Sequence, residues 1–406
     1  MADDPDEAEY QHGVSLQRAG RFEEAVAVYL PLAERALTVK LATNLGLALG
    51  ETAEYPQAPH YLKLAAEHRR TDGGLWRALG RAYGESGDLD LAEQAYRNAL
   101  ALDPRDLHAE LGLGGVYLSG GRYAEGWPLM SARAELHPDV VPAVVVPYPE
   151  WRGEPIDGKS ILVWVEQGFG DKIQFARFAK ALKSRGASRV SLACSPNLTD
   201  LFSTLTGVDE LIPIGVGAST SVASHDYWSR YLSLPEHLGI TLETLPSEPY
   251  LAAPPQRRAR WAGFGRGARV GVAWKASPTG FNGVNKGLPD PLAERLLAVG
   301  AISLHPEDTG AKDFADTAAI IDGLDLLVSI DTSVAHLAGA MGKPCWTLLP
   351  ALHCDWRWLR DRTSSPWYPT MRLYRQTRAK DWTETIDRVI DDLAAAGLAG
   401  RGLGAP

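Results

Sequence analysis

A glycine recurs along the first third of the chain at an almost constant interval. The interval is 33, 34 and 34 residues between Gly13, Gly46, Gly80 and Gly114. The same interval separates the small residues Ala25, Ala58 and Ala92, and the larger residues Tyr29, Leu62 and Tyr96. A period of about 20–50 residues is typical of a solenoid, in which each copy buries its apolar face against the next. We therefore expect an array of helix pairs over residues 1–137.

The third copy shows which kind of repeat this is. It carries the complete tetratricopeptide pattern of Trp76, Leu79, Gly80, Tyr83, Ala92, Tyr96, Ala99 and Pro104. The fourth copy is weaker and has Gly126 where the other copies have alanine. We predict about four tetratricopeptide repeats, forming an all-α superhelix. Such a superhelix holds an extended peptide or a partner helix on its concave surface, or else it only braces the next domain or self-associates.

Bulk properties exclude several functions. The net charge is −9 over 406 residues, which argues against general nucleic-acid binding. The three cysteines have no C-x-x-C spacing, so we expect neither a disulfide framework nor a zinc site. The N-terminus has no apolar signal core, and no apolar run approaches the roughly 18–20 residues that span a bilayer. We expect a cytoplasmic protein without a membrane span.

The rest of the chain alternates between apolar runs and helical segments, which predicts an α/β fold with parallel sheets. Two similar halves are expected, with a cleft between the carboxyl ends of their strands. Strands are expected at 161–165, 189–193, 210–214, 227–232, 270–274, 301–304, 324–330 and 345–349. Helices are expected at 172–185, 197–206, 290–299, 314–323, 332–341 and 382–396. The predicted segments are a linker at 138–158, a first half at 159–245, a second linker at 246–268, a second half at 269–396 and a flexible tail at 397–406.

One block in the second half suits a phosphate or a sugar. Asp331, Thr332 and Ser333 lie where the expected strand 324–330 meets the next helix, and His336 follows in that helix. Exposed N–H groups and the positive end of the helix dipole favour an anion there. Two alternatives involve no ligand: Thr332 or Ser333 caps the helix, or His336 is a satisfied structural residue.

A second block lies at the corresponding point of the first half. Gln167, Gly168, Phe169 and Gly170 form a glycine-containing loop that allows close approach of a ligand, and Asp171 begins the next helix. Asp171 either faces the cleft or only favours the helix N-terminus, and Glu166 is a second carboxylate nearby. The last glycine of G-x-G-x-x-G is replaced by Ile173, which argues against a dinucleotide oxidoreductase.

These two blocks, together with the sequence Asp355-Trp356-Arg357-Trp358-Leu359 and the segment Ser365–Pro369, resemble GT-B glycosyltransferases. The closest resemblance is to bacterial tetratricopeptide proteins with a heptosyltransferase-like or O-GlcNAc-transferase-like domain. The resemblance implies a GT-B fold with two Rossmann-like halves, a nucleotide-sugar donor, inverting chemistry and no metal or other cofactor. It makes Asp171 the candidate base that removes the proton of the acceptor hydroxyl.

The resemblance also assigns residues to the donor. Lys286, in a Gly/Asn-rich loop, would stabilise the diphosphate leaving group, and Asp331, Thr332, Ser333 and His336 would bind donor phosphates and sugar. Lys275 is a second phosphate contact or a surface charge, and His305 is expected near the nucleotide. The aromatic residues Trp356, Trp358, Trp367 and Tyr368 either wall the donor pocket or pack the core.

The sequence thus predicts an inverting glycosyltransferase that modifies a hydroxyl of a protein held by the repeats, such as flagellin or another bacterial protein. Two alternatives stay open. One is a heptosyltransferase-type enzyme acting on a glycan or lipid-linked sugar. The other is a non-catalytic scaffold with a degenerate sugar-nucleotide-binding domain.

Overall fold

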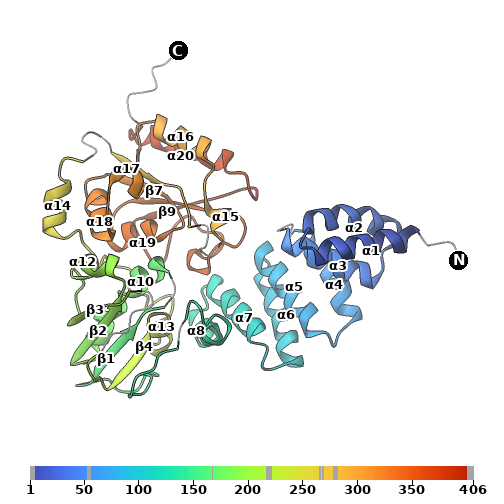
Figure 1. Ribbon diagram of the computed structural model, residues 1–406, viewed down its shortest axis with the longest axis horizontal. Helices are drawn as coiled ribbons and strands as arrows, with labels where there is room; N and C mark the ends of the chain where they lie inside the picture. The colour runs from blue at the N-terminus through green and yellow to red at the C-terminus, as the bar shows by residue number, and fades with distance from the viewer. Residues whose placement is uncertain are drawn as a thin grey trace, which may run out of the picture. The chain divides into compact units, whose positions relative to one another are not determined.

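The computed structural model describes residues 5–52, 56–141, 143–166, 168–215, 222–264, 267, 269–277 and 282–399. The chain divides into two compact units, Met1–Leu136 and His137–Pro406. Figure 1 shows the first unit as helices alone and the second as sheets with helices around them.

The first unit is built from consecutive antiparallel helices, each packed on the next (Figure 1). Its helices are α1 (Pro5–Arg18), α2 (Phe22–Ala36), α3 (Val39–Glu51), α4 (Ala58–His68), α5 (Gly73–Ser86), α6 (Leu89–Leu102), α7 (Leu107–Ser119), α8 (Tyr123–Leu129), the 3-10 turn η1 (Met130–Ala132) and α9 (Arg133–Leu136). The strongest contacts are within the pairs α1–α2, α3–α4, α5–α6 and α7–α8. Four helix pairs are what the glycine period predicts.

The repeated glycines explain how the two helices of a pair approach each other. A Cβ atom on Gly13 would lie 2.2 Å from Tyr29, and one on Gly80 would lie 2.9 Å from the ring of Tyr96. Gly46 faces Leu62 in the same way, at 2.7 Å. Such distances leave no room for a side chain, so the glycine and the large residue sixteen positions later fit together.

In the fourth helix pair, the larger and the smaller residue of one contact change places. In the third repeat, Gly84 of α5 lies against Ala92 of α6. In the fourth repeat the corresponding residues are Leu118 of α7 and Gly126 of α8, and a Cβ on Gly126 would lie 2.7 Å from Cγ of Leu118. The glycine that weakens the sequence pattern therefore accommodates a leucine that is completely buried.

The second unit contains two parallel sheets, one in each half. The first has strand order β3-β2-β1-β4 and consists of β1 (Ser160–Trp164), β2 (Arg189–Cys194), β3 (Glu210–Pro213) and β4 (Tyr227–Arg230). The second has order β6-β5-β7-β8-β9 and consists of β5 (Val270–Ala273), β6 (Ile302–Ser303), β7 (Leu326–Ile330), β8 (Cys345–Leu349) and β9 (Met371–Arg375). The central strand β1 pairs Ile161 with Val190 on one side and with Tyr227 on the other.

Helices and short turns connect these strands. Those of the first half are α10 (Phe169–Phe175), α11 (Phe178–Ser184), η2 (Pro196–Leu198), α12 (Thr199–Phe202), η3 (Tyr231–Ser233) and α13 (Leu234–His237). Those that follow are α14 (Pro255–Trp261), α15 (Gly283–Lys286), α16 (Asp290–Ala298), α17 (Pro306–Thr309), α18 (Phe314–Asp322), α19 (Ser333–Ala340), η4 (Trp356–Trp358) and α20 (Thr383–Ala395).

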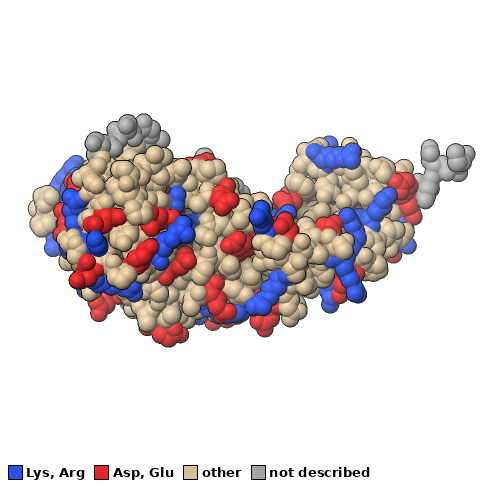
Figure 2. Space-filling view, turned by 90° about the horizontal axis from the view of Figure 1, so that it is seen from below, with Lys and Arg blue, Asp and Glu red and all other residues tan. Residues whose placement is uncertain are grey.

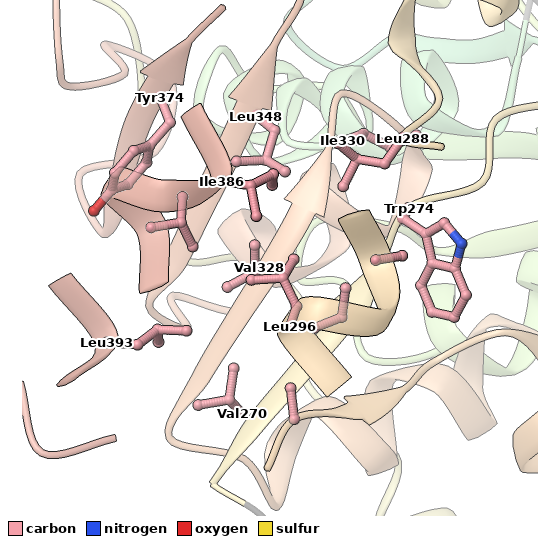
Figure 3. Close-up of a cluster of buried hydrophobic side chains, with 14 of the residues drawn as sticks. Val270, Trp274, Leu288, Leu296, Val328, Ile330, Leu348, Tyr374, Ile386 and Leu393 are labelled. Carbon is pink, nitrogen blue, oxygen red and sulfur yellow. The ribbon is translucent and has the colours of Figure 1, made fainter. Parts of the chain in front are cut away.

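The second half is held by a buried apolar cluster between its sheet and two helices. Val328 of β7 lies at its centre, with Leu296 of α16 and Ile386 of α20 packed beside it (Figure 3). All three side chains are completely buried. The cluster continues to Trp274, which directly follows β5, and to Ile330, the last residue of β7 (Figure 3). The core thus fixes the strand ends from which the candidate site residues project.

All eight predicted strands are present, but several other expectations were wrong. The helix expected at 172–185 is two helices, because Tyr250 and Arg177 donate hydrogen bonds to the carbonyl oxygens of Ile173 and Gln174. In place of the helix expected at 197–206, a 3-10 turn at Pro196–Leu198 is followed by a short helix that ends at Phe202. Helix α14 lies inside the predicted linker 246–268, and strand β9 was not expected. Part of the predicted tail, residues 400–406, lies outside the described residues.

The structure also bears on the membrane span and on the distribution of surface charge. Across the described parts of the chain, every helix is too short or too polar to span a bilayer. On the face shown in Figure 2, lysine and arginine side chains are interspersed with aspartate and glutamate. The sequence as a whole has a net charge of −9.

Candidate functional site

The candidate residues lie where each sheet reverses its winding. In the first sheet the chain moves outward from β1 through β2 to β3 and then returns to the other side of β1 with β4. In the second sheet it moves from β5 to β6 and then crosses to β7 on the other side of β5. Ligands of open α/β sheets bind outside the carboxyl ends of strands at such reversals. Asp171 follows β1, and Lys286 and Asp331 follow β5 and β7.

The two reversals meet through helices α10 and α19, which pack against each other (Figure 1). The two helices come close at Gly170, in the first turn of α10. A Cβ atom there would lie 3.0 Å from Cδ2 of His336 and 3.7 Å from the Cα of Ser333. The predicted loop glycine is therefore needed for contact between the halves.

Two predicted donor residues form a buried ion pair. Nζ of Lys286 lies 2.9 Å from Oδ2 of Asp331, and these side chains are only 11% and 5% exposed. Nε2 of His336 lies 3.9 Å from the other carboxylate oxygen of Asp331. The structure thus brings Lys286, Asp331 and His336 together, as predicted.

Arg357 joins this group to the first half. Its Nη2 donates a hydrogen bond to Oδ1 of Asp171, and its Nη1 donates to Oδ2 of Asp355 at 2.7 Å. Its Nε donates to the side-chain oxygen of Gln174. The second oxygen of Asp171 accepts the N–H of Gly168 at 3.1 Å. We call Asp171, Lys286, Asp331, His336, Asp355 and Arg357 the charge cluster.

The carboxylates of the cluster differ in their proton affinity. Loss of water raises the pKa of Asp171, and the opposing effect of Arg357 does not cancel this increase. Burial acts in the same direction on Asp355, but Arg357 and Lys286 outweigh it and leave the pKa of Asp355 below its usual value. Burial would lower the pKa of Lys286, yet Asp331 and Asp355 hold it above the ordinary value. Asp171 is therefore the stronger base of these two carboxylates, which suits proton abstraction.

His336 is a neutral member of the cluster. Burial and the positive charge of Arg357 lower the pKa of His336 to about 3. Its Nδ1 shares a hydrogen bond of 3.0 Å with the hydroxyl of Tyr368, and its ring stacks on Trp358 at 5.4 Å. The histidine is thus held as a packed, uncharged side chain facing Asp331.

Two buried donors beside the cluster lack a partner within the described residues: Nε2 of Gln174 and Nε1 of Trp358. Leaving such a group unpaired costs about 1–3 kcal/mol. A polar ligand or an ordered water accounts for such donors better than packing does. Both belong to residues that touch the charge cluster, Gln174 through Arg357 and Trp358 through His336.

The other predicted donor residues are less directly placed. Thr332 precedes α19 but makes no side-chain capping bond, so the capping alternative is wrong for this hydroxyl. Ser333 is the first residue of α19. Lys275 is paired with Glu307 at 2.7 Å on the surface, and His305 packs its ring against Trp274 at the neighbouring strand ends. These two residues have no described contact with the charge cluster.

The next residues are those predicted in and beside the loop that follows β1. Gln167 lies outside the described residues. Phe169 is 37% exposed and contacts Phe314 of α18. Asp171 does accept the helix N-terminal N–H of Gly168, so its structural role is present together with the Arg357 contact. Glu166 is buried and accepts the N–H of Leu232 at 2.6 Å, which is a structural role.

Sequence reasoning missed three members of the site: Arg357, Asp355 and Gln174. The block 355–359 was used for the family resemblance, without a role for its charged residues. Of the aromatic residues expected to wall the pocket or pack the core, Trp358 and the later Trp367 are completely buried. The arginine between two tryptophans was the available signal, because a buried cation needs carboxylate partners. Those partners could not be identified, since Asp171 lies 186 residues earlier.

The cluster combines three carboxylates, two cations and a neutral imidazole. Cations beside buried donors can stabilise a developing negative charge, and a carboxylate with a raised pKa can accept a proton. The predicted independence from metal stays a prediction.

Comparison with known proteins agrees with the repeats. A family model for the tetratricopeptide repeat matches residues 77–132. The chain is 26% identical to Protein FlbA of Caulobacter vibrioides over 450 residues, which covers 88% of this chain and 74% of FlbA. An alignment over this share of the chain includes residues of both units.

Two solved structures resemble separate parts of the chain. A MamA structure from Desulfovibrio magneticus RS-1 covers 33% of this chain and 75% of its own, with 21% identity and a TM-score of 0.30. A family 9 glycosyl transferase from Veillonella parvula covers 60% of this chain and 98% of its own, with 13% identity and a TM-score of 0.43. The chain is an array of helix pairs, of which residues 77–132 match the tetratricopeptide-repeat model, followed by a parallel α/β unit.

Proposed function

We propose that the chain is a GT-B glycosyltransferase that moves a sugar from a nucleotide-sugar to a hydroxyl of a protein. One observation carries the proposal. The winding reversals of two parallel sheets meet, and there they bring a candidate base, Asp171, together with a candidate diphosphate site at Lys286 and Asp331.

The second half would bind the donor. Lys286 and the N-terminus of α19 offer positive charge to a diphosphate, and Asp331 accepts hydroxyls of the sugar. Thr332 supports this role, because its hydroxyl is not used as a helix cap. In this proposal His305 contacts the nucleotide, and Lys275, which pairs with Glu307 on the surface, is a second phosphate contact or a surface charge. No metal or other cofactor takes part in this proposal.

The first half would bind the acceptor. Asp171 has a raised pKa and so keeps affinity for a proton. As a general base it would remove the acceptor proton while the hydroxyl attacks the sugar carbon and the nucleoside diphosphate leaves. One displacement of this kind inverts the anomeric configuration. The repeats upstream favour a protein acceptor, such as flagellin, because these arrays hold peptides.

The test combines binding and transfer. Calorimetry with UDP, GDP, ADP and CMP should identify one nucleotide that binds the wild type. Lys286→Ala and Asp331→Ala should weaken its binding strongly, whereas Asp171→Asn should keep binding and lose transfer. Arg295→Ala is a suitable control, because Arg295 pairs with Asp387 on the surface. Normal turnover in both donor-side variants would contradict the donor-site assignment.

The acceptor can be identified by comparing the glycoproteins of cells with and without the gene. Glycoproteins lost on deletion of the gene, and restored by wild type but not by Asp171→Asn, would be the acceptors. Recovery of a modified glycan or lipid-linked sugar instead would favour the heptosyltransferase-type alternative.

A non-catalytic scaffold is the second candidate, and one observation favours it: both cations of the cluster are already paired with carboxylates of the same chain. Nucleotide-sugar binding with neither transfer nor slow donor hydrolysis would support the scaffold.

A further inference from the structure

Arg357 is held from both halves of the second unit. Two of its acceptors, Asp171 and Gln174, belong to α10 in the first half, and the third, Asp355, belongs to the second half. Asp355 also accepts the backbone N–H of Arg357 at 3.0 Å. The position of this cation is therefore determined by the fold.

Aromatic rings fix the same guanidinium. Its central carbon lies 4.4 Å from the ring centre of Trp356 and 5.4 Å from that of Phe175. The side chain of Arg357 is only 7% exposed. A planar cation with rings beside it and three acceptors has little freedom to rotate, so it can orient a carboxylate.

We propose that Arg357 is a positioning residue for sugar transfer: its guanidinium fixes the Asp171 carboxylate in one orientation and supplies the positive charge that this anion needs. The inference rests on the proposed function, because it gives Asp171 the part of the base. The oxygen Oδ1 is held by Arg357, and Oδ2, to which Gly168 donates its N–H among the described residues, has a second lone pair for the acceptor proton.

Other charges around Asp171 act on it as well. Asp355 and Glu166 raise the pKa of Asp171, whereas Lys172 on the same helix interacts with its negative charge and donates a hydrogen bond to Ser195 at 3.3 Å. His336, which packs on Gly170, is neutral. The positive charge of Arg357 is the main influence that favours the ionised carboxylate, together with the N–H of Gly168.

The activity test compares Arg357→Gln with Arg357→Lys. The glutamine variant should lower kcat/KM about 100-fold, and the acid limb of its pH profile should move up by about one pH unit. The lysine variant keeps the charge but loses the planar geometry, so its acid limb should stay near that of the wild type with a loss of about tenfold. An unchanged acid limb in Arg357→Gln would overturn the proposal and leave Arg357 as a contact between halves.

A second measurement needs no substrate and covers variants of low activity. Denaturant unfolding of wild type, Asp171→Asn, Arg357→Gln and the double variant gives the coupling between the two side chains. Coupling should grow as the pH rises through the titration of Asp171 and vanish in acid, because only the ionised carboxylate attracts the guanidinium. Arg295→Gln, a surface control, should show no coupling to Asp171→Asn.

The outcomes separate the two proposals. Absence of coupling at every pH would overturn the role of Arg357, whether or not the enzyme is active. Clear coupling in a wild type that transfers no sugar would overturn the proposed function and, with it, the positioning role in transfer.

Discussion

Gly170 and His336 are in contact across the two halves of the α/β unit: a Cβ on Gly170 would lie 3.0 Å from Cδ2 of the imidazole. His336 is buried between Trp358 and Tyr368 and cannot move away easily. We therefore expect Gly170→Ala to destabilise the protein by about 1–3 kcal/mol, which is typical of overpacking. Thermal unfolding measures this, and nucleotide affinity should fall with it. Unchanged melting would show that the halves tolerate a wider separation.

Removal of Lys286 should show how much the buried carboxylate of Asp331 lowers stability when its cation is missing. The pair is buried, so Lys286→Met leaves an uncompensated carboxylate and should cost about 3–5 kcal/mol. Lys286→Met with Asp331→Leu removes both charges and should recover much of that stability without restoring nucleotide binding. Chemical denaturation and calorimetry distinguish the two effects. Recovery of binding in the double variant would contradict a donor role for the pair.

The depressed pKa of His336 predicts a pH-dependent stability. Since the folded value is about 3 and the unfolded value about 6.5, the unfolded state binds more protons between these limits. Stability should therefore rise with pH across this window and fall on acidification, by about 2–3 kcal/mol between pH 6.5 and 4.5. Arg357, Lys286 and Arg177 oppose protonation there.

His336→Gln should flatten this dependence, whereas His12→Gln, at an exposed position of α1, should not. Unfolding curves at several pH values give the comparison. An equally steep dependence in His336→Gln would assign the acid sensitivity to other groups.

The fourth repeat predicts a compensating pair. Gly126→Ala should destabilise by about 1–3 kcal/mol in spite of the better helix propensity of alanine, because its Cβ would lie 2.7 Å from Leu118. Adding Leu118→Ala should relieve the clash and reproduce the small-residue packing of the third repeat. Gly115→Ala is a control, since its Cβ would meet no atom within 4 Å. The melting temperature should be lower for Gly126→Ala than for Gly115→Ala, and adding Leu118→Ala to Gly126→Ala should raise it. Equal destabilisation by Gly126→Ala and Gly115→Ala would contradict a clash between residues 126 and 118.

The parts of the fold with a local cause could be predicted from sequence. The glycine period determines the helix pairs, since Gly13 and Gly80 must face Tyr29 and Tyr96. The apolar runs of β1, β5 and β7 are buried on both faces, which makes such strands recognisable. The ligand-facing ends of these strands follow from parallel topology, so Asp171 and Asp331 were also within reach.

The features that were missed have distant causes. Helix α14 is held by ion pairs of Arg257 with Asp200, Asp313 and Asp316, 56 to 59 residues away. Strand β9 lies at the edge of its sheet, and its second and last residues are Arg372 and Arg375, so it has no long apolar run. The role of Arg357 depends on its hydrogen bonds to Asp171 and Gln174, which belong to the other half of the α/β unit.

The guanidinium of Arg177 has a consequence for how this chain can be divided. It is buried, and it donates to Gln174 in the first half, to Pro246 in the connecting segment and to Trp367 in the second half. A fragment cut between the two sheets would expose this cation without its acceptors on one side and leave the acceptors without a donor on the other. We therefore expect the two halves to fold as one unit, and a chimera that exchanges one half must carry both sides of this contact.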